Sequence, residues 1–350
     1  MKEKIESDIL IIGAGPVGLF TVFEAGLLGL KCVIIDNLDK VGGQCAELYP
    51  DKPIFDIPGV PQQSAEEHIQ ALLKQIKPFK YGLYLGERVE QIHQIKSNEN
   101  VKKWKILTSE SKEFTATNIF IAAGGGSFEP RRPPNITNPD RFLDKGVAYS
   151  VRNKRNYKNK NIVIFGGGDS ALDWTVELAD IANSITLVHR RDEFRGARST
   201  EAQMRELVET GKVDLKTPFV IEGLLGTDSI SGVAIKHFET KHIEELTCDE
   251  ILFLFGLNKK LGPIAQWGID LEGKKISVDT EKFQSNIEGI FAVGDINHYP
   301  GKLDLILCGF HETTLAVQYA FKRCFPGKRV PFGYTTSNTK LHKKLGVKVD

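Results

Sequence analysis

The sequence has no long apolar run, no excess of charge of one sign and no closely spaced pair of cysteines. With 46 Lys and Arg against 45 Asp and Glu, the formal net charge of the 350 residues is +1, so no overall field favours nucleic acid or an anionic membrane as the partner. The apolar run near the N-terminus is interrupted by Gly13 after a few residues, which argues against a signal peptide or a spanning helix. We therefore expect a cytoplasmic protein.

The five cysteines are widely spaced, at positions 32, 45, 248, 308 and 324. They form no CxxC motif and no zinc-type cluster, so we expect unpaired thiols in a reducing compartment and no metal site. Hydrophobic residues make up 41% of the chain and charged residues 26%, which is typical of an ordinary globular protein, and the length suits about two domains.

Two units with the pattern strand, glycine turn, helix, strand lie about 150 residues apart. In the first unit, the apolar run 8–12 leads into a GxGxxG turn, a helical stretch and a second apolar run that ends in Asp36. Gly13 permits the tight turn, Gly15 lets the backbone approach a pyrophosphate, and Gly18 lets the helix pack closely on the strand. The helix start favours a phosphate, and Asp36 can bind ribose hydroxyls, so the unit predicts a dinucleotide site rather than a plain glycine loop.

The second unit has the apolar run 161–165, a turn of three glycines and Ala171 in place of the last glycine of the motif. The position 23 residues after its first glycine, which is Asp36 in the first unit, is His189. Three arginines follow, namely Arg190, Arg191 and Arg195. A carboxylate there would repel a 2′-phosphate, whereas arginines bind one, so we predict NADP(H) rather than NAD(H). The alternative is a solvated helix start.

The first glycine-turn unit ends in an acidic residue, and the second is followed by arginines. This difference indicates two different dinucleotides, FAD in the first unit and NADP(H) in the second. The predicted NADP(H) contacts are Gly166, Gly168, Asp169, Ser170, Ala171, His189, Arg190, Arg191 and Arg195.

Three further motifs extend this pattern, at residues 41–44, 119–124 and 286–295. With the two glycine turns they resemble the two-dinucleotide-binding-domain flavoprotein family, and within it the thioredoxin-reductase-like branch, from residue 8 to about residue 325. The resemblance implies that 286–295 is a second FAD motif, so that the FAD domain is interrupted by the NADP(H) domain. It implies an α/β homodimer of two Rossmann-like domains per chain, with an FAD-binding domain at 1–118 and 251–330, an NADP(H)-binding domain at 119–250 and a C-terminal extension over the flavin at 331–350.

Thioredoxin reductases of this family carry a redox CxxC just before the second glycine turn, where this chain has Ser150 and Asn153. Neither side chain can form a disulfide, so electrons must leave the flavin directly. The absence of the CxxC, together with the motifs at residues 42–50 and 166–174, makes this chain resemble the thioredoxin-reductase-like ferredoxin or flavodoxin NADP reductases. The resemblance implies a FAD-dependent oxidoreductase that exchanges a hydride with NADPH and single electrons with ferredoxin or flavodoxin.

The same resemblance implies which residues lie at the flavin. We predict that Tyr49 stacks on one face and that Tyr334 of the C-terminal extension covers the other, with Thr335 or Thr336 near the reactive nitrogen. The alternative for Tyr49 is a buried core residue whose hydroxyl is hydrogen-bonded. Phe332 is the competing aromatic residue, and a disordered tail is the alternative. The predicted FAD contacts are Gly13, Gly15, Pro16, Gly18, Asp36, Gly43, Gln44, Tyr49, Gly294, Asp295 and Thr336.

Further expectations concern the surroundings of the flavin. Residues 309–314 should open a helix whose positive end faces the flavin, the alternative being a capped surface helix. Domain movement should use hinges near 124–126 and 254–257. Basic runs that could dock an acidic carrier, or simply be solvated surface, lie at 131–132, 152–160, Lys340, Lys343 and Lys344.

Two other functions stay open at this point. Cys45 lies beside the flavin loop and could make the chain an NADPH-dependent disulfide reductase, although it could equally be a small buried apolar residue. A redox-sensing binding protein without turnover is the third possibility, and no appended module in the sequence supports it.

Overall fold

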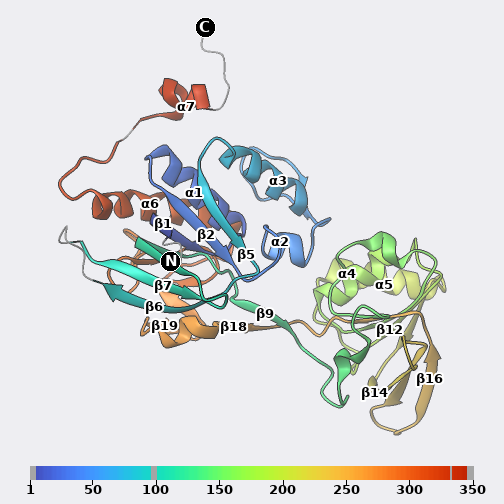
Figure 1. Ribbon diagram of the computed structural model, residues 1–350. Coiled ribbons are helices and arrows are strands. Elements are labelled where there is room, and N and C mark those ends of the chain that lie inside the picture. The colour runs from blue at the N-terminus through green and yellow to red at the C-terminus, as the bar shows by residue number, and fades with distance from the viewer. Residues whose placement is uncertain (1–4, 96–100, 332, 345–350) are drawn as a thin grey trace. The chain divides into compact units, whose positions relative to one another are not determined.

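The computed structural model describes residues 5–95, 101–331 and 333–344 (Figure 1). The chain divides into two compact units, unit 1 with residues 1–127 and 259–350, and unit 2 with residues 128–258. The chain passes from unit 1 to unit 2 nine residues later than the first boundary expected from the sequence, and it returns to unit 1 eight residues later than the second expected boundary. The reason is that the connecting segments are themselves strands, β9 (Ser127–Pro130) and β18 (Leu257–Lys260), which pair with each other.

Unit 1 is built around a seven-stranded sheet with the order β5-β2-β1-β8-β7-β6, in which β21 also pairs with β8. Strands β5, β2, β1, β8 and β21 are parallel, whereas β7 and β6 are antiparallel to their neighbours. The strands of this sheet are β1 (Ile5–Ile12), β2 (Cys32–Asp36), β5 (Tyr81–Leu85), β6 (Val89–Ile95), β7 (Lys103–Thr108), β8 (Glu113–Ile121) and β21 (Ile290–Ala292). The shorter strands of unit 1 are β3 (Pro53–Ile54), β4 (Gln63–Ser64), β19 (Leu271–Glu272), β20 (Lys275–Ser277) and β22 (Asn297–His298).

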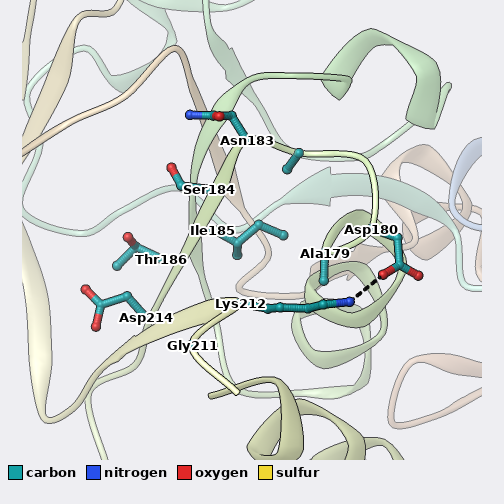
Figure 2. Close-up of a pocket in the computed structure, with 10 residues that line it drawn as sticks. Ala179, Asp180, Asn183, Ser184, Ile185, Thr186, Gly211, Lys212 and Asp214 are labelled. Atoms are coloured by element: carbon teal, nitrogen blue, oxygen red, sulfur yellow. Dashed lines mark hydrogen bonds and ion pairs between the residues drawn. The ribbon is translucent and has the colours of Figure 1, made fainter. Parts of the chain in front are cut away.

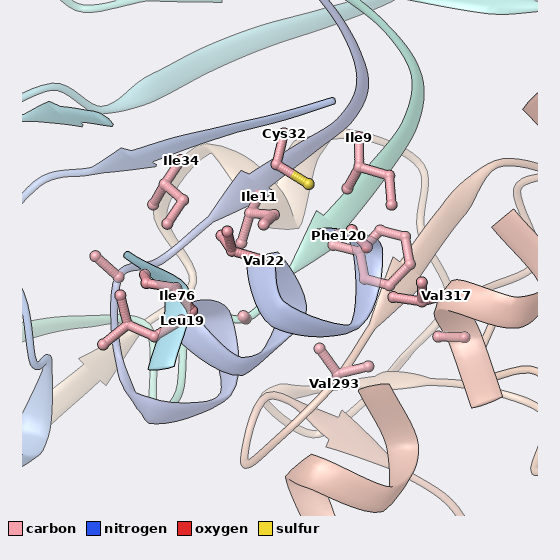
Figure 3. Close-up of a cluster of buried hydrophobic side chains, with 14 of the residues drawn as sticks. Ile9, Ile11, Leu19, Val22, Cys32, Ile34, Ile76, Phe120, Val293 and Val317 are labelled. Atoms are coloured by element: carbon pink, nitrogen blue, oxygen red, sulfur yellow. The ribbon is translucent and has the colours of Figure 1, made fainter. Parts of the chain in front are cut away.

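Helices cover one face of this sheet. They are α1 (Pro16–Leu27), α2 (Gln44–Glu47), α3 (Ala65–Ile76) and α6 (Ile306–Cys324), and the C-terminal segment adds α7 (Thr339–Lys344). Because side chains alternate along a strand, Ile9 and Ile11 of β1 pack with Leu19 and Val317 of the helices (Figure 3). Leu10 packs on the opposite face of the sheet. Each fully buried aliphatic side chain of this kind contributes about 1.5–3 kcal/mol.

Short 3-10 helices complete the connections. Unit 1 has η3 (Gly262–Gln266) and η4 (Thr335–Ser337), and unit 2 has η1 (Pro139–Phe142) and η2 (Lys154–Tyr157). Helix α6 begins three residues before the segment 309–314, in which the sequence predicted a helix start. Within the three described ranges, no helix is both long enough and apolar enough to cross a bilayer.

Unit 2 has a five-stranded parallel sheet with the order β10-β17-β11-β12-β13 and an antiparallel sheet of β14, β15 and β16. Alternate residues of β11 face opposite sides: Ile162 and Ile164 pack toward the helices, and Val163 and Phe165 toward the antiparallel sheet. The elements are β10 (Val147–Ala148), β11 (Asn161–Phe165), α4 (Asp169–Leu178), β12 (Ser184–Val188), α5 (Arg198–Glu209), β13 (Val213–Lys216), β14 (Phe219–Leu225), β15 (Gly232–His237), β16 (Ile243–Thr247) and β17 (Glu250–Phe253).

Candidate functional site

The first glycine turn joins β1 to α1 at the carboxyl end of the parallel strands. A Cβ atom at Gly13, where φ is +114°, would lie 2.4 Å from the carbonyl oxygen of Ala122, and one at Gly18 would lie 1.9 Å from the carbonyl oxygen of Gly13. Gly15 is the N-cap of α1 and Pro16 its first residue, and no side chain caps the helix. Both the close backbone packing and the uncapped helix start therefore fit a pyrophosphate.

Asp36 ends β2 directly over this turn. Its Oδ2 accepts a hydrogen bond from the Ala14 N–H at 2.5 Å, and its Oδ1 accepts one from the Leu38 N–H at 2.8 Å. Burial raises the pKa of Asp36, while these two backbone hydrogen bonds lower it. The carboxylate is thus fixed beside the turn, where a dinucleotide presents its ribose hydroxyls.

The loop before α2 brings the remaining predicted FAD motifs to the same place. A Cβ atom at Gly43, where φ is +55°, would lie 3.1 Å from the Cα atom of Gly15, so this loop approaches the glycine turn closely. Gln44 donates from Nε2 to Oδ2 of Asp295 at 3.3 Å, which joins two motifs 251 positions apart in the sequence. Gly124 lies against the same amide, because its Cβ would be 3.1 Å from Gln44 Nε2. The structure therefore assembles all four segments, and their contacts with FAD stay a prediction.

Sequence reasoning missed the buried group that holds the Gly294 loop, the carboxylate of Glu312 on α6. It is 0% exposed. Its Oε2 accepts from the Gly294 N–H at 2.7 Å and from Asn297 Nδ2 at 2.7 Å. Its Oε1 accepts from the Tyr299 hydroxyl at 3.0 Å and from Lys302 Nζ at 2.5 Å. The signal was present, since Glu312 is four residues before the buried Ala316 and therefore shares the inward face of the helix.

Each carboxylate oxygen of Glu312 accepts two hydrogen bonds, so its negative charge is well compensated. The side chain of Lys302, which pairs with it, is only 2% exposed. A buried ion pair of this kind resists separation, because removing one partner leaves an uncompensated buried charge. The peptide N–H of Gly294 is therefore fixed by α6, and with it the backbone that presents Asp295.

Tyr49 is half-buried against the helical core of unit 1 and forms a side-chain hydrogen bond with Cys45. Cys45 itself is 2% exposed, and burial raises the pKa of its thiol to about 11. A buried thiol that stays protonated at neutral pH is a poor nucleophile. These observations count against the disulfide reductase that uses Cys45.

The C-terminal extension gives a different picture. Tyr334 is 72% exposed, and Thr336 in η4 is exposed as well. Phe332, the competing aromatic residue, lies outside the described residues, as do the side chains of Lys340 and Lys344. The placement of Tyr334 or Thr336 at the flavin therefore stays a prediction.

The second glycine turn joins β11 to α4. A Cβ atom at Gly166 would lie 2.6 Å from the carbonyl oxygen of Leu254, and Gly168 is the N-cap of α4 with no side-chain cap. A Cβ atom at Gly168 would meet nothing within 4 Å, so the turn is open above the helix start. Ala171 is fully buried beneath the turn and Asp169 accepts a hydrogen bond from the Ala197 N–H at 2.9 Å.

A cavity of about 890 Å³ lies over this turn within unit 2. Its lining includes every predicted NADP(H) contact except the buried Ala171. His189 follows β12 and stacks on Phe194 with ring centroids 5.2 Å apart. Burial lowers the pKa of His189, and the neighbouring arginines lower it further. The three exposed arginines at positions 190, 191 and 195 thus supply permanent positive charge around a largely neutral imidazole, which fits a 2′-phosphate.

Three further residues that line this cavity were not predicted from the sequence as cofactor contacts. Arg131 and Arg132, interpreted from the sequence as part of a basic surface run, line the cavity together with Phe238. Arg132 pairs with Asp140 at 2.8 Å, and its guanidinium lies 5.7 Å from the ring centroid of Tyr149. These residues are distant in sequence from the glycine turn, so only the fold brings them to it.

A second cavity of unit 2, of about 360 Å³, lies at the other end of the sheet (Figure 2). It is lined by Ser184 at the start of β12 and by Lys212, which precedes β13 and pairs with Asp180 at 3.0 Å. Ligands of open parallel sheets bind at the carboxyl ends of the strands, so the first cavity is the better cofactor site.

No redox disulfide stands before the second turn. Asn153 is the N-cap of η2, where its side chain accepts a hydrogen bond from the Arg155 N–H at 3.0 Å, and Ser150 precedes it. All five cysteines, which lie within the described ranges, are free.

The family model of the pyridine nucleotide-disulphide oxidoreductases matches residues 7–318 of this chain. The chain belongs to this family. A ferredoxin–NADP reductase of Bradyrhizobium diazoefficiens is 51% identical over 348 residues, which cover 99% of this chain and 100% of the relative. A ferredoxin–NADP reductase of Pelagibacter ubique is 46% identical over 346 residues, or 98% of this chain and 99% of the relative.

Solved structures give the same fold. The thioredoxin reductase of Lactococcus lactis matches with a TM-score of 0.71 and 25% identity over 91% of this chain and 98% of that chain. The thioredoxin reductase of T. acidophilum matches with a TM-score of 0.71 and 17% identity over 91% of this chain and 99% of that chain. The predicted family and α/β fold class are confirmed, and the chain is an oxidoreductase.

Proposed function

We propose that this oxidoreductase is a FAD-dependent ferredoxin–NADP⁺ reductase. One observation carries the proposal: an arginine-lined cavity over the second glycine turn occurs in a chain that has Ser150 and Asn153 in place of a redox disulfide. The relatives named ferredoxin–NADP reductase match over nearly the full length of both chains and support it. One NADPH then reduces two molecules of a one-electron carrier, and one proton is released.

The cofactors are FAD in unit 1 and NADP(H) in unit 2. Bound FAD supplies the chemistry of accepting a hydride and passing on single electrons. The residues of the chain bind and orient: the first glycine turn and Asp36 bind the FAD pyrophosphate and ribose, and Gln44 and Asp295 meet beside them. In unit 2 the α4 start binds the NADP(H) pyrophosphate, and the three arginines bind its 2′-phosphate.

Several finer features belong to the same proposal. The enzyme is a cytoplasmic homodimer. Ferredoxin or flavodoxin is its carrier, and Tyr334 and Thr336 of the C-terminal extension cover the flavin. Tyr49 stacks on the other flavin face, where its half-buried position beside Cys45 supports the assignment.

Steady-state kinetics of the purified holoenzyme test the proposal. NADPH and NADH are compared as donors, with ferredoxin or flavodoxin as acceptor. The expected result is a strong preference for NADPH and reduction of at least one carrier, with turnover unchanged in Cys45→Ser because that thiol is buried and protonated. Equal use of both donors, or no reduction of either carrier, would reject the proposal. Loss of turnover in Cys45→Ser with FAD still bound would favour the disulfide reductase.

A further inference from the structure

The ring of Phe238 is an exposed aromatic surface inside the NADP(H) cavity. Phe238 follows the last residue of β15, on the turn that leads to β16, and is 55% exposed although it lines the cavity. A single exposed aromatic residue is ordinary on a protein surface. One that lines a cavity with a glycine turn and three arginines has a surface that a planar ligand can cover.

Two backbone hydrogen bonds fix the position of Phe238 in the cavity. The N–H of Phe238 donates to the carbonyl oxygen of Pro218 at 2.8 Å. Phe219, which follows Pro218 in the chain, donates from its N–H to the carbonyl oxygen of His189 at 2.9 Å. The turn is therefore tied to the end of β12, from which the arginines follow. Phe238 belongs to the β12 side of the cavity.

That side is the adenosine side of a bound dinucleotide. In a Rossmann-like unit the pyrophosphate lies at the glycine turn and the ribose next to the adenine lies at the end of the second strand. Here the second strand is β12, and the residues after it are His189, Arg190 and Arg191. The adenine base thus lies beyond the arginines, in the direction of the β15–β16 turn.

Lys241 holds the ring in place. Its Nζ lies 5.1 Å from the ring centroid of Phe238 and donates to the Phe238 carbonyl oxygen at 2.5 Å. Its own N–H donates to the carbonyl oxygen of His237 at 3.1 Å, which closes the turn. The ammonium group of Lys241 lies over one face of the Phe238 ring, so a planar base can stack on the opposite face.

We propose that Phe238 stacks on the adenine of NADP(H) and binds the adenosine half together with the arginines. The proposal rests on the proposed function, because it places the cofactor in the same cavity. Stacking between an aromatic side chain and a base is sequence-tolerant and strong enough that its removal weakens binding by about fivefold to a hundredfold. The arginines select the 2′-phosphate, and Phe238 contributes affinity for the base.

Calorimetric titration of the holoenzyme with adenosine 2′,5′-bisphosphate and with NADP⁺ tests this assignment. We expect Phe238→Ala to weaken both ligands by the same factor, about tenfold, and Phe238→Trp to bind both at least as tightly as the wild type. Ile243→Ala is the matched control, because Ile243 begins β16 on the same hairpin, is 49% exposed and does not line the cavity. This control should leave both affinities unchanged.

The outcomes separate this inference from the proposed function. If the wild type binds neither ligand, the proposed NADP(H) site fails. If the wild type binds both and Phe238→Ala binds them equally well, the site stands and the stacking role is wrong. If Phe238→Ala and Ile243→Ala weaken binding alike, or if Phe238→Trp does not bind, the effect comes from the hairpin structure and the stacking role is again wrong.

Discussion

Asp36 and His189 occupy equivalent positions after two similar glycine turns, and their difference decides which dinucleotide each unit suits. The carboxylate of Asp36 accepts two backbone hydrogen bonds and can accept more from ribose hydroxyls. The lowered pKa of His189 leaves the arginines as the charges that face a phosphate. Sequence counting predicted this contrast, because the spacing from glycine to ribose-binding position is set by one strand, one helix and a second strand.

Removal of Arg190 and Arg191 tests this contrast. We expect Arg190→Ala and Arg191→Ala each to lower kcat/KM for NADPH by about tenfold to a hundredfold, because each loses a charge-assisted hydrogen bond to phosphate. The value for NADH, which has no 2′-phosphate, should change little. Steady-state kinetics with both donors measure the ratio, and Arg88→Ala, in which the lost guanidinium pairs with Glu90 on unit 1, is the control. Equal losses for NADPH and NADH would contradict the assignment.

The Glu312 carboxylate is a positioning group that acts through Gly294. Glu312→Gln leaves Lys302 buried without its countercharge, which costs about 3–5 kcal/mol, and it loosens the loop at Asp295. We expect a lower thermal midpoint and a lower ratio of FAD to protein after dialysis. Flavin absorbance and thermal unfolding measure the two effects.

The double variant Glu312→Gln with Lys302→Met separates charge from shape. It removes the unpaired cation, so its thermal midpoint should lie above that of Glu312→Gln alone. Independent, additive losses from the two substitutions would show that the ion pair does not hold the loop.

Helices and strands with a clear hydrophobic periodicity could be predicted from the sequence. Elements whose position depends on packing against segments far away in the sequence could not. The two strand, turn and helix units lie where the sequence placed them, although β1 begins at Ile5, three residues before the expected start at Asp8, whereas β11 begins at Asn161 as expected. The start of α6 was placed three residues late because its glycine and polar residues imitate a helix start, whereas Gly309 serves close packing against Val17. The roles of Arg131 and Phe238 depend on contacts between segments far apart in sequence, which no local pattern contains.

Helix α1 carries a partly buried carboxyl group, Glu24, that makes stability depend on pH. Burial raises the pKa of Glu24 from 4.5 to about 6. Between these values the folded state binds more protons than the unfolded state, so the free energy of unfolding falls as pH rises through this window. Above about pH 6, the destabilisation that comes from ionised Glu24 no longer changes with pH and is about 2 kcal/mol at most.

Glu24→Gln removes this titration. We expect its thermal midpoint to exceed that of the wild type above pH 6, with the gap closing as pH falls toward 4.5. Thermal unfolding of the holoenzyme across this range measures the gap. A gap that is independent of pH would mean that the Glu24 carboxylate is not buried at a cost.

At the scale of the whole molecule, unit 1 is interrupted by unit 2; unit 1 carries the motifs that we propose bind FAD, and unit 2 carries the cavity that we propose binds NADP(H). The late motif at Gly294 predicted that the chain returns to the first domain. The exact positions at which the chain passes between the units were not predictable from it, because they lie in β9 and β18, which pair with each other in a separate two-stranded sheet.

The C-terminal extension adds a prediction at this scale. If Tyr334 covers the flavin, Tyr334→Ala removes a stacked ring and should raise flavin fluorescence, whereas Tyr334→Phe should keep the wild-type signal. Fluorescence of the bound flavin in the holoenzyme measures this. An unchanged signal in Tyr334→Ala would place the extension away from the flavin.

Transfer of electrons straight from the flavin to a carrier protein is the central claim, and a single-turnover measurement tests it most directly. The holoenzyme is reduced anaerobically with one equivalent of NADPH and mixed rapidly with oxidised ferredoxin or with oxidised thioredoxin, while flavin absorbance is followed. The account predicts fast reoxidation by ferredoxin and none by thioredoxin, because Ser150 and Asn153 cannot relay electrons to a disulfide. Fast reoxidation by thioredoxin, with ferredoxin inert, would contradict it.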